Sequence, residues 1–282
     1  MNGVPGDQSI RIAGDAVGVL LIHGLGGAPG DMRVVANELA SAGYTLHVPQ
    51  LAGHRVDDLK ATNWQEWYAT VEKEHYTLRE SCDVVIVGGL SIGAVLALHH
   101  AAQHPRDVVG AILYATWLCR DGWSMPWYSA LANLVRRRSL AKLFAFAERR
   151  SCRIKDPRTQ ALMPQVMSSG ESAQVGVCAL SSAQMLKLRH LIKQVKLEMP
   201  QVRQPALVIH LREDDHASLR NLEYMQANLG GPITTVILDS TYTTVTIAQQ
   251  RKLIVDRSLR FIEQLTKPSV STLGHEDNSE GL

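Results

Sequence analysis

Short apolar runs alternate with segments of helical periodicity along most of the chain. Val17–Ile22 is a continuous apolar run of strand length, and it is followed by a glycine-rich loop and a helical pattern over about 30–42. The same order recurs further along. Other strands are expected at Thr45–Val48, Asp83–Val87, Val108–Tyr114, Ala206–His210 and Thr234–Leu238. Other helices are expected at Trp64–Leu78, Ile92–His104, Leu219–Leu229 and Ala248–Leu265.

Apolar strands without polar alternation, each followed by a helix, indicate a mostly parallel sheet that is buried on both faces. We therefore predict an α/β fold whose core consists of residues 9–115 and 205–266. Between 116 and 204 the alternation stops, and helical stretches carry many arginines and aromatic side chains. We expect this insertion to form a helical lid over the carboxyl ends of the strands, where open α/β sheets bind ligands. Residues 267–282 are polar, and we expect them to be disordered.

The composition, with 45% hydrophobic and 20% charged residues, is that of an ordinary globular protein. A net charge of +2 provides no strong field toward nucleic acid or an anionic membrane, so the run Arg136–Arg138 is interpreted as a solvated helix face. The expected partner is a small, neutral molecule. The four cysteines lack metal-type spacing and are expected to be reduced, and we predict neither a cofactor nor a metal.

The chain shows no signal for a membrane span or for secretion. Met1–Gln8 lacks a basic segment followed by an apolar one, and the longest apolar run, Val84–Leu98, is shorter than a bilayer requires. We therefore expect a cytoplasmic location.

Gly89–Gly93 reads G-L-S-I-G and lies between a predicted strand and a predicted helix. A serine on such a sharp turn brings neighbouring backbone close together, so glycines are required on both sides of Ser91. The N-terminal N–H groups of the following helix would favour a developing oxyanion. This context favours a nucleophile elbow with Ser91 as the nucleophile, and the alternative is a plain glycine-rich turn.

His23–Gly27 reads H-G-L-G-G and closes the first long apolar strand. Such a loop can direct the backbone N–H of Leu25 toward the same pocket, where it would form the oxyanion hole together with the N–H of Ile92. A phosphate-binding loop is the alternative, but the spacing fits neither G-x-G-x-x-G nor a Walker A motif. We interpret His23 as a structural hydrogen-bonding residue.

These motifs, together with GYTLHVPQLAGH at Gly43–His54, DGWSMPWYS at Asp121–Ser129 and LVIHLREDD at Leu207–Asp215, resemble the α/β-hydrolase superfamily. The chain is most similar to its bacterial carboxylesterase and monoacylglycerol-lipase-like members, from about 10 to 265. The resemblance implies the α/β-hydrolase fold. It does not by itself fix the chemistry.

In this family the acid of the catalytic triad follows the strand after the lid, which places Asp214 in that role. Asp215 and a solvated acidic loop are the alternatives. The catalytic histidine should follow the next strand, but an ungapped alignment of D-S-T-Y-T-T-V-T-I places Thr243 at that position. The resemblance therefore predicts a degenerate triad, because threonine cannot replace imidazole as a general base.

Other histidines are candidates for a substitute base. His216, two residues after Asp214, is the first of these, although an exposed loop residue without a catalytic role is the simpler interpretation. His275 in the tail and His54 in the L-A-G-H loop are weaker candidates. His99 and His100 are interpreted as packing residues of the helix behind the elbow. In the lid, Trp123 and Trp127 are expected to line the substrate pocket.

Two functional hypotheses follow. The first is a serine acyl hydrolase, an esterase or thioesterase acting on an apolar acyl substrate, with Ser91, Asp214 and a displaced or missing base. The second keeps the fold and pocket but not hydrolysis, and the chain then binds a ligand or catalyses acyl transfer or cyclisation. The acyl group, the leaving group and the oligomeric state do not follow from the sequence.

Overall fold

The computed structural model describes residues 7–25, 27–53, 62–119, 182–212, 217–238 and 244–266. The strands in these ranges are β1 (Ile10–Ile12), β2 (Val17–Ile22), β3 (Thr45–Val48), β4 (Val84–Leu90), β5 (Val108–Tyr114), β6 (Ala206–Leu211) and β7 (Ile233–Leu238). The helices are η1 (Pro29–Met32), α1 (Arg33–Ser41), α2 (Trp64–Arg79), α3 (Ile92–Gln103), α6 (Ser182–Glu198), η3 (Met199–Gln201), α7 (Arg220–Asn228) and α8 (Thr244–Thr266).

The strands form one sheet in the order β1-β3-β2-β4-β5-β6-β7. Strand β1 pairs antiparallel with β3, and each of the other pairings is parallel. The predicted α/β-hydrolase architecture, a mostly parallel sheet flanked by helices, is therefore confirmed. In the parallel part of the sheet all carboxyl ends meet at one edge, and the loop after β4 that carries Ser91 lies at this edge.

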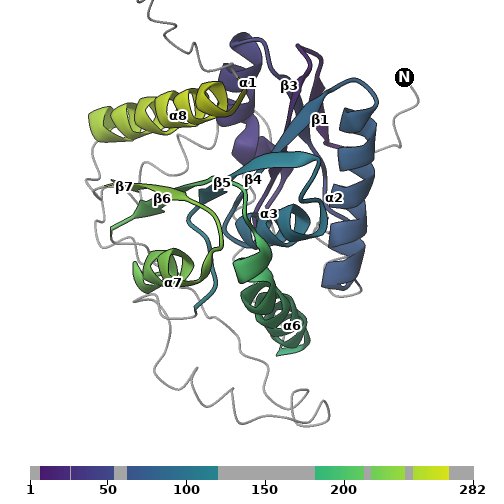
Figure 1. Cartoon of the computed structure of the whole chain (residues 1–282), viewed down its shortest axis with the longest axis vertical. Helices are drawn as coiled ribbons and strands as arrows, with labels where there is room; N and C mark the ends of the chain where they lie inside the picture. The colour runs from purple at the N-terminus through teal and green to yellow at the C-terminus, as the bar shows by residue number, and fades with distance from the viewer. Residues whose placement is uncertain are drawn as a thin grey trace, which may run out of the picture.

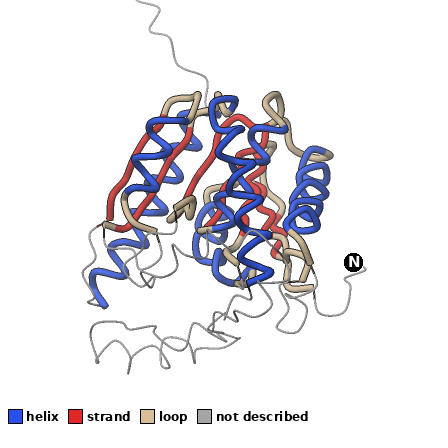
Figure 2. The backbone as a smooth tube through the Cα atoms, turned by 90° about the horizontal axis from the view of Figure 1, so that it is seen from below, coloured by secondary structure: helices blue, strands red, loops and turns tan. Residues whose placement is uncertain are grey.

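Hydrophobic side chains pack on both faces of the sheet. On one face, Leu20 and Ile22 of β2 share a core cluster with α2, α3, α6 and α7, whereas Val19 and Leu21 share a cluster with α1 and α8 on the other. Figure 1 shows α1 and α8 on one side of the sheet and α3, α6 and α7 on the opposite side. Seen from below, in Figure 2, the strands run side by side with helices packed across them.

Most predicted elements are present with small shifts at their ends. The bounds of β2, β3 and β5 agree with the prediction. The first predicted helix begins with the short 3₁₀ turn η1, and α8 begins at Thr244, four residues before its predicted start. The short edge strand β1 was not predicted.

The expected lid segment, 116–204, is described only at its two ends. Residues 120–181, with Trp123 and Trp127, and the tail after Thr266 lie outside the described residues. At the carboxyl-terminal end of the segment, α6 packs into the core cluster of α3 through Leu188, Leu191 and Val195, which are at most 1% exposed. This helix therefore forms part of the core layer, and a lid made of 120–181 stays a prediction.

None of the helices in the described part of the chain is long and apolar enough to cross a membrane.

Candidate active site

Ser91 lies in a sharp turn between β4 and α3. Its backbone has φ 56° and ψ −110°, a left-handed conformation that is strained for a residue with a side chain. Its N–H donates to the carbonyl oxygen of Tyr114 at 2.8 Å, so the turn is fixed to the end of the neighbouring strand β5. Strain of this kind costs about 1–3 kcal/mol and is concentrated at functional sites.

The two glycines around Ser91 leave no room for side chains. A Cβ at Gly89 would lie 2.4 Å from the carbonyl carbon of Gly93, and a Cβ at Gly93 would lie 2.1 Å from the carbonyl oxygen of Ile22. Both obstructing atoms belong to the backbone, which cannot move aside cheaply. The prediction that this turn requires both glycines is confirmed.

The loop after β2 lies against the elbow. A Cβ at Gly24 would lie 3.8 Å from the Cβ of Ser91, and the N–H of Gly27 donates to the carbonyl oxygen of Gly24 at 3.1 Å. Leu25 is half-buried and packs against the core cluster that contains Ile92. Ile92 is the first residue of α3, and its N–H has no acceptor within the helix. The use of Leu25 and Ile92 as the oxyanion donors stays a prediction.

His23 is fully buried at the start of this loop. Its Nε2 accepts a hydrogen bond from the N–H of Leu51 at 3.1 Å, so the ring proton resides on Nδ1, which donates to the carbonyl oxygen of Gly24 at 2.9 Å. Burial outweighs the hydrogen bond to Gly24 and lowers the pKa of His23 to about 4. A neutral ring that is bonded at both nitrogens fixes the loop, which confirms the structural role predicted for His23.

The remaining predicted site residues lie outside the described residues: Asp214, Asp215, His216, Thr243, His54 and His275. The strand before Asp214 is nevertheless well defined, since β6 ends at Leu211. His210, which sequence analysis did not single out, is 1% exposed, and its Nε2 donates to the carbonyl oxygen of Ala217 at 2.9 Å. This bond joins the two ends of the segment that contains Asp214.

His99 and His100 lie on the body of α3 and are buried. The Nδ1 of His99 lies 2.6 Å from Oε2 of Glu198 on α6, and the ring makes edge contacts with Trp64 and Tyr68. His99 therefore links α3 to α6 and α2. The prediction that His99 and His100 are packing residues is confirmed.

A model of the alpha/beta hydrolase family matches residues 19–245, a range that contains both loops described above. The chain belongs to this family. Its curated relatives include a thermostable monoacylglycerol lipase of Bacillus sp. (strain H-257), 27% identical over 87% of this chain and 90% of the relative. A carboxylesterase of Bacillus subtilis (strain 168) is 36% identical over a shorter stretch, 28% of this chain and 34% of the relative.

Two solved structures cover most of this chain with a similar fold. A structure from the metagenome-derived lipolytic enzymes LipS and LipT is 26% identical and covers 93% of this chain and 99% of its own, with a TM-score of 0.67. The monoacylglycerol lipase of Paleococcus ferrophilus, 14% identical with a TM-score of 0.62 over 89% of this chain and 98% of its own, shares the fold.

Proposed function

We propose that this chain is a serine-nucleophile acyl hydrolase, an esterase or thioesterase acting on an apolar acyl substrate through a degenerate triad. The observation that carries the proposal is the strained backbone of Ser91, at φ 56°, where β4 ends and α3 begins. The names of the relatives, a monoacylglycerol lipase and a carboxylesterase, support the substrate class.

In the proposed reaction the Oγ of Ser91 attacks the acyl carbonyl carbon while a base accepts the hydroxyl proton. The N–H groups of Leu25 and Ile92 stabilise the oxyanion, the alcohol or thiol leaves with a proton, and water then releases the acid. Asp214, three residues after the end of β6, is the proposed acid that orients the base. Lid residues Trp123 and Trp127 are proposed to contact the acyl chain.

The proposed triad lacks a histidine at its expected position, which is occupied by Thr243, directly before α8. Loss of the base in a serine hydrolase costs on the order of 10⁶ in turnover, and about 10³ to 10⁴ over the uncatalysed rate remains from the oxyanion hole and binding. We expect the wild-type chain to hydrolyse activated esters slowly, with His216 as the proposed substitute base.

The second candidate function is non-hydrolytic and is favoured by the same threonine. In this case the pocket binds an apolar ligand or catalyses acyl transfer or cyclisation, with the substrate supplying the base. The retained elbow is compatible with both functions, because Ser91 and its glycines would hold an acyl group in either.

The test compares hydrolysis of p-nitrophenyl butyrate and of a short acyl thioester by the wild type and a set of variants. Thr243→His should raise kcat/KM by at least about 10², because the new ring supplies the missing proton acceptor. Adding Ser91→Ala should return the rate to background. Thr241→His is the matched control, since it introduces the same ring two residues away, and it should leave the rate unchanged.

Two results would contradict the hydrolase. If Ser91→Ala alone leaves wild-type activity intact, Ser91 is not the nucleophile. If Thr243→His gives no increase while the protein stays folded by circular dichroism, and His216→Asn also leaves the rate unchanged, the pocket serves other chemistry. Loss of the wild-type rate in His216→Asn, without loss of folding, would identify His216 as the substitute base.

A further inference from the structure

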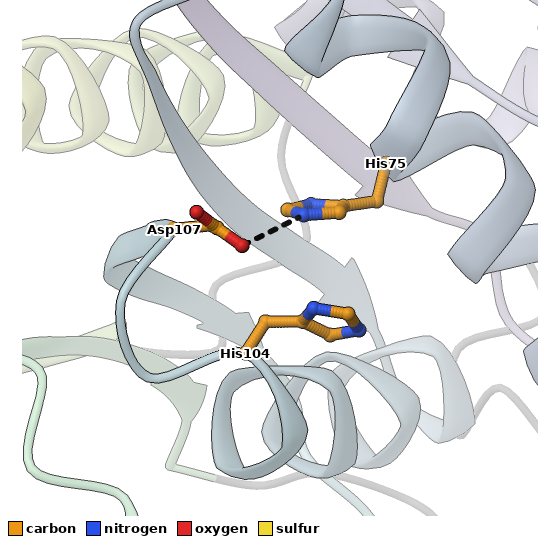
Figure 3. Close-up of side chains that lie close together, drawn as sticks. All are labelled: His75, His104 and Asp107. Carbon is orange, nitrogen blue, oxygen red and sulfur yellow. Dashed lines mark ion pairs between the residues drawn. The ribbon is translucent and has the colours of Figure 1, made fainter.

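Three potential metal ligands meet at the edge of the sheet opposite Ser91. His75 comes from α2, His104 directly follows α3, and Asp107 directly precedes β5. One ligand atom of each residue lies within 4.8 Å of the other two, and Nε2 of His75 lies 3.8 Å from Oδ2 of Asp107. Figure 3 shows the two rings and the carboxylate facing one another.

Three of the four ring nitrogens of the two histidines lack a hydrogen-bond partner among the described residues. His75 is 0% exposed, and neither of its ring nitrogens has a partner there; the same holds for Nε2 of His104. A buried polar group without a partner is destabilising, so such groups are rare and call for an explanation. A bound cation would explain these nitrogens, because it accepts the lone pair of a neutral imidazole.

We propose that His75, His104 and Asp107 bind a divalent transition-metal ion, with Zn²⁺ as the ion of best fit. Two imidazoles and one carboxylate are a common donor set for Zn²⁺, which binds nitrogen at about 2.0–2.1 Å and oxygen at about 2.0–2.2 Å. These bond lengths place tetrahedral ligand atoms roughly 3.3 Å apart. The separations, 3.8 Å between His75 and Asp107 and up to 4.8 Å within the cluster, exceed this value, so the side chains would rotate inward when the ion binds.

A second carboxylate lies beside His104. Oε1 of Glu72, on α2, lies 3.8 Å from Nε2 of His104, and its side chain is 42% exposed. Asp107 is 39% exposed, so a hydrated cation can reach the cluster from solvent. Water would complete the coordination.

The charges around the cluster favour a cation despite one nearby arginine. Nε of Arg79 lies 3.8 Å from Oδ1 of Asp107, but its NH1 donates to the backbone carbonyl oxygens of Cys82 and Asp83, which hold the guanidinium in place. The two carboxylates outweigh this single positive charge. The ring of His100 packs against His75 and His104, with centroids 4.6 and 4.4 Å away.

The location indicates a structural ion. Asp107 precedes the first residue of β5, whereas Tyr114, which accepts the hydrogen bond from Ser91, is its last residue. The length of β5 therefore separates the proposed metal site from the turn that carries Ser91. Binding would join α2 to the end of α3 and to the entrance of β5, and it does not depend on the proposed hydrolysis.

The test titrates tag-free, EDTA-treated protein with Zn²⁺ by calorimetry and with Co²⁺ by visible absorption. We expect one equivalent to bind, a d–d spectrum typical of tetrahedral Co²⁺, and a melting temperature raised by roughly 5–10 °C at a Zn²⁺ concentration 100 times the Kd.

Asp107→Asn and His104→Gln, at partly exposed positions that the fold tolerates more readily than the buried His75, should each weaken binding at least tenfold. The matched control is His190→Gln, an exposed histidine of α6, which should leave binding unchanged. Failure of the folded wild type to bind either ion would overturn the proposal. Unchanged affinity and Co²⁺ spectrum in the double variant of Asp107 and His104 would overturn it as well.

Discussion

The turn around Ser91 shows how closely single residues are specified at this site. Added to Gly93, a methyl group would lie 2.1 Å from the carbonyl oxygen of Ile22 and 2.6 Å from that of His23. We expect Gly93→Ala to destabilise the protein by about 2 kcal/mol or more, because backbone atoms must move apart. The melting temperature should then fall by roughly 4–8 °C, measured by differential scanning fluorimetry.

Gly30→Ala is the matched control for this substitution. No atom outside the local backbone lies within 4 Å of the position that its methyl group would take. Its effect should stay within about 0.5 kcal/mol. Equal melting temperatures for the Gly93 and Gly30 variants would show that the backbone at the elbow yields more easily than its geometry indicates.

At the residue scale, the sequence predicted the site features that depend on the spacing of residues close together in the chain. The two glycines around Ser91 and the structural role of His23 follow from motifs of five residues each, so they could be recognised. The cluster of His75 and Asp107 could not, because α2, β4 and α3 separate the two residues along the chain. A local signal was the four-residue spacing of His100 and His104, which places His104 about one turn after His100, at the residue that follows α3.

At the scale of elements, Glu74 links α2 to the edge of the sheet. Its Oε1 accepts from NH2 of Arg11 on β1 at 2.6 Å, and its Oε2 lies 2.9 Å from Nδ1 of His47 on β3. We expect Glu74→Gln to lower the free energy of unfolding at pH 7 by about 1–3 kcal/mol, since hydrogen bonds to a charged group are lost. Urea denaturation measures the change.

Glu38→Gln provides the comparison for this helix–sheet link. Glu38 is an exposed glutamate of α1, so the same chemical change should alter the free energy of unfolding by less than about 0.5 kcal/mol. A Glu74 variant as stable as the Glu38 variant would mean that Arg11 and His47 contribute no net stability through this carboxylate.

Elements buried on both sides were predicted best. β2 and β5 are continuous apolar runs, because helices cover both faces of the central sheet, and their bounds agree with the structure. The edge strand β1 has only three residues, with Arg11 between two half-buried isoleucines, so it lacks such a run. The packing of α6 on α3 was not predicted. The apolar residues of α6 indicate a helix with a buried face, but they do not indicate which surface that face covers.

For the whole molecule, several buried groups determine how stability responds to acid, and His23 and Glu74 represent the two kinds, a buried histidine and a paired carboxylate. Burial lowers the pKa of His23 to about 4, below the value of about 6.5 in an unfolded chain. Burial also lowers the pKa of His75 to about 4 and that of His100 well below its ordinary value. Burial alone would raise the pKa of Glu74, but hydrogen bonds from His47 and Arg11 and the charge of Arg11 outweigh it and lower this pKa to about 2. In both cases the unfolded state binds more protons than the folded state. The free energy of unfolding therefore decreases as the pH is lowered.

The two groups act in different pH ranges. The His23 contribution should be lost between about pH 6.5 and 4, and by itself it lowers the free energy of unfolding by about 2 kcal/mol from pH 7 to pH 5; His75 and His100, whose pKa values are also lowered by burial, add to this decrease. The Glu74 contribution should be lost between about pH 4.5 and 2. Urea denaturation at pH 7, 5 and 3, in the presence of EDTA, should show the first decrease in both the wild type and Glu74→Gln, and a smaller second decrease in the variant. Constant stability from pH 7 to 5 would contradict the role given to His23.

Both ends of the insertion between β5 and β6 are fixed to the core. Asn221 accepts from the N–H groups of Leu118 and Cys119 at 2.7 and 2.6 Å, and α6 is buried against α3 at the other end. A chain closed in this way has an entropic cost that grows only with the logarithm of its length, about 0.6 kcal/mol for each doubling. We therefore expect changes in the length of residues 120–181 to alter the stability of the scaffold by less than about 1 kcal/mol, as long as the anchors at Asn221 and α6 are kept.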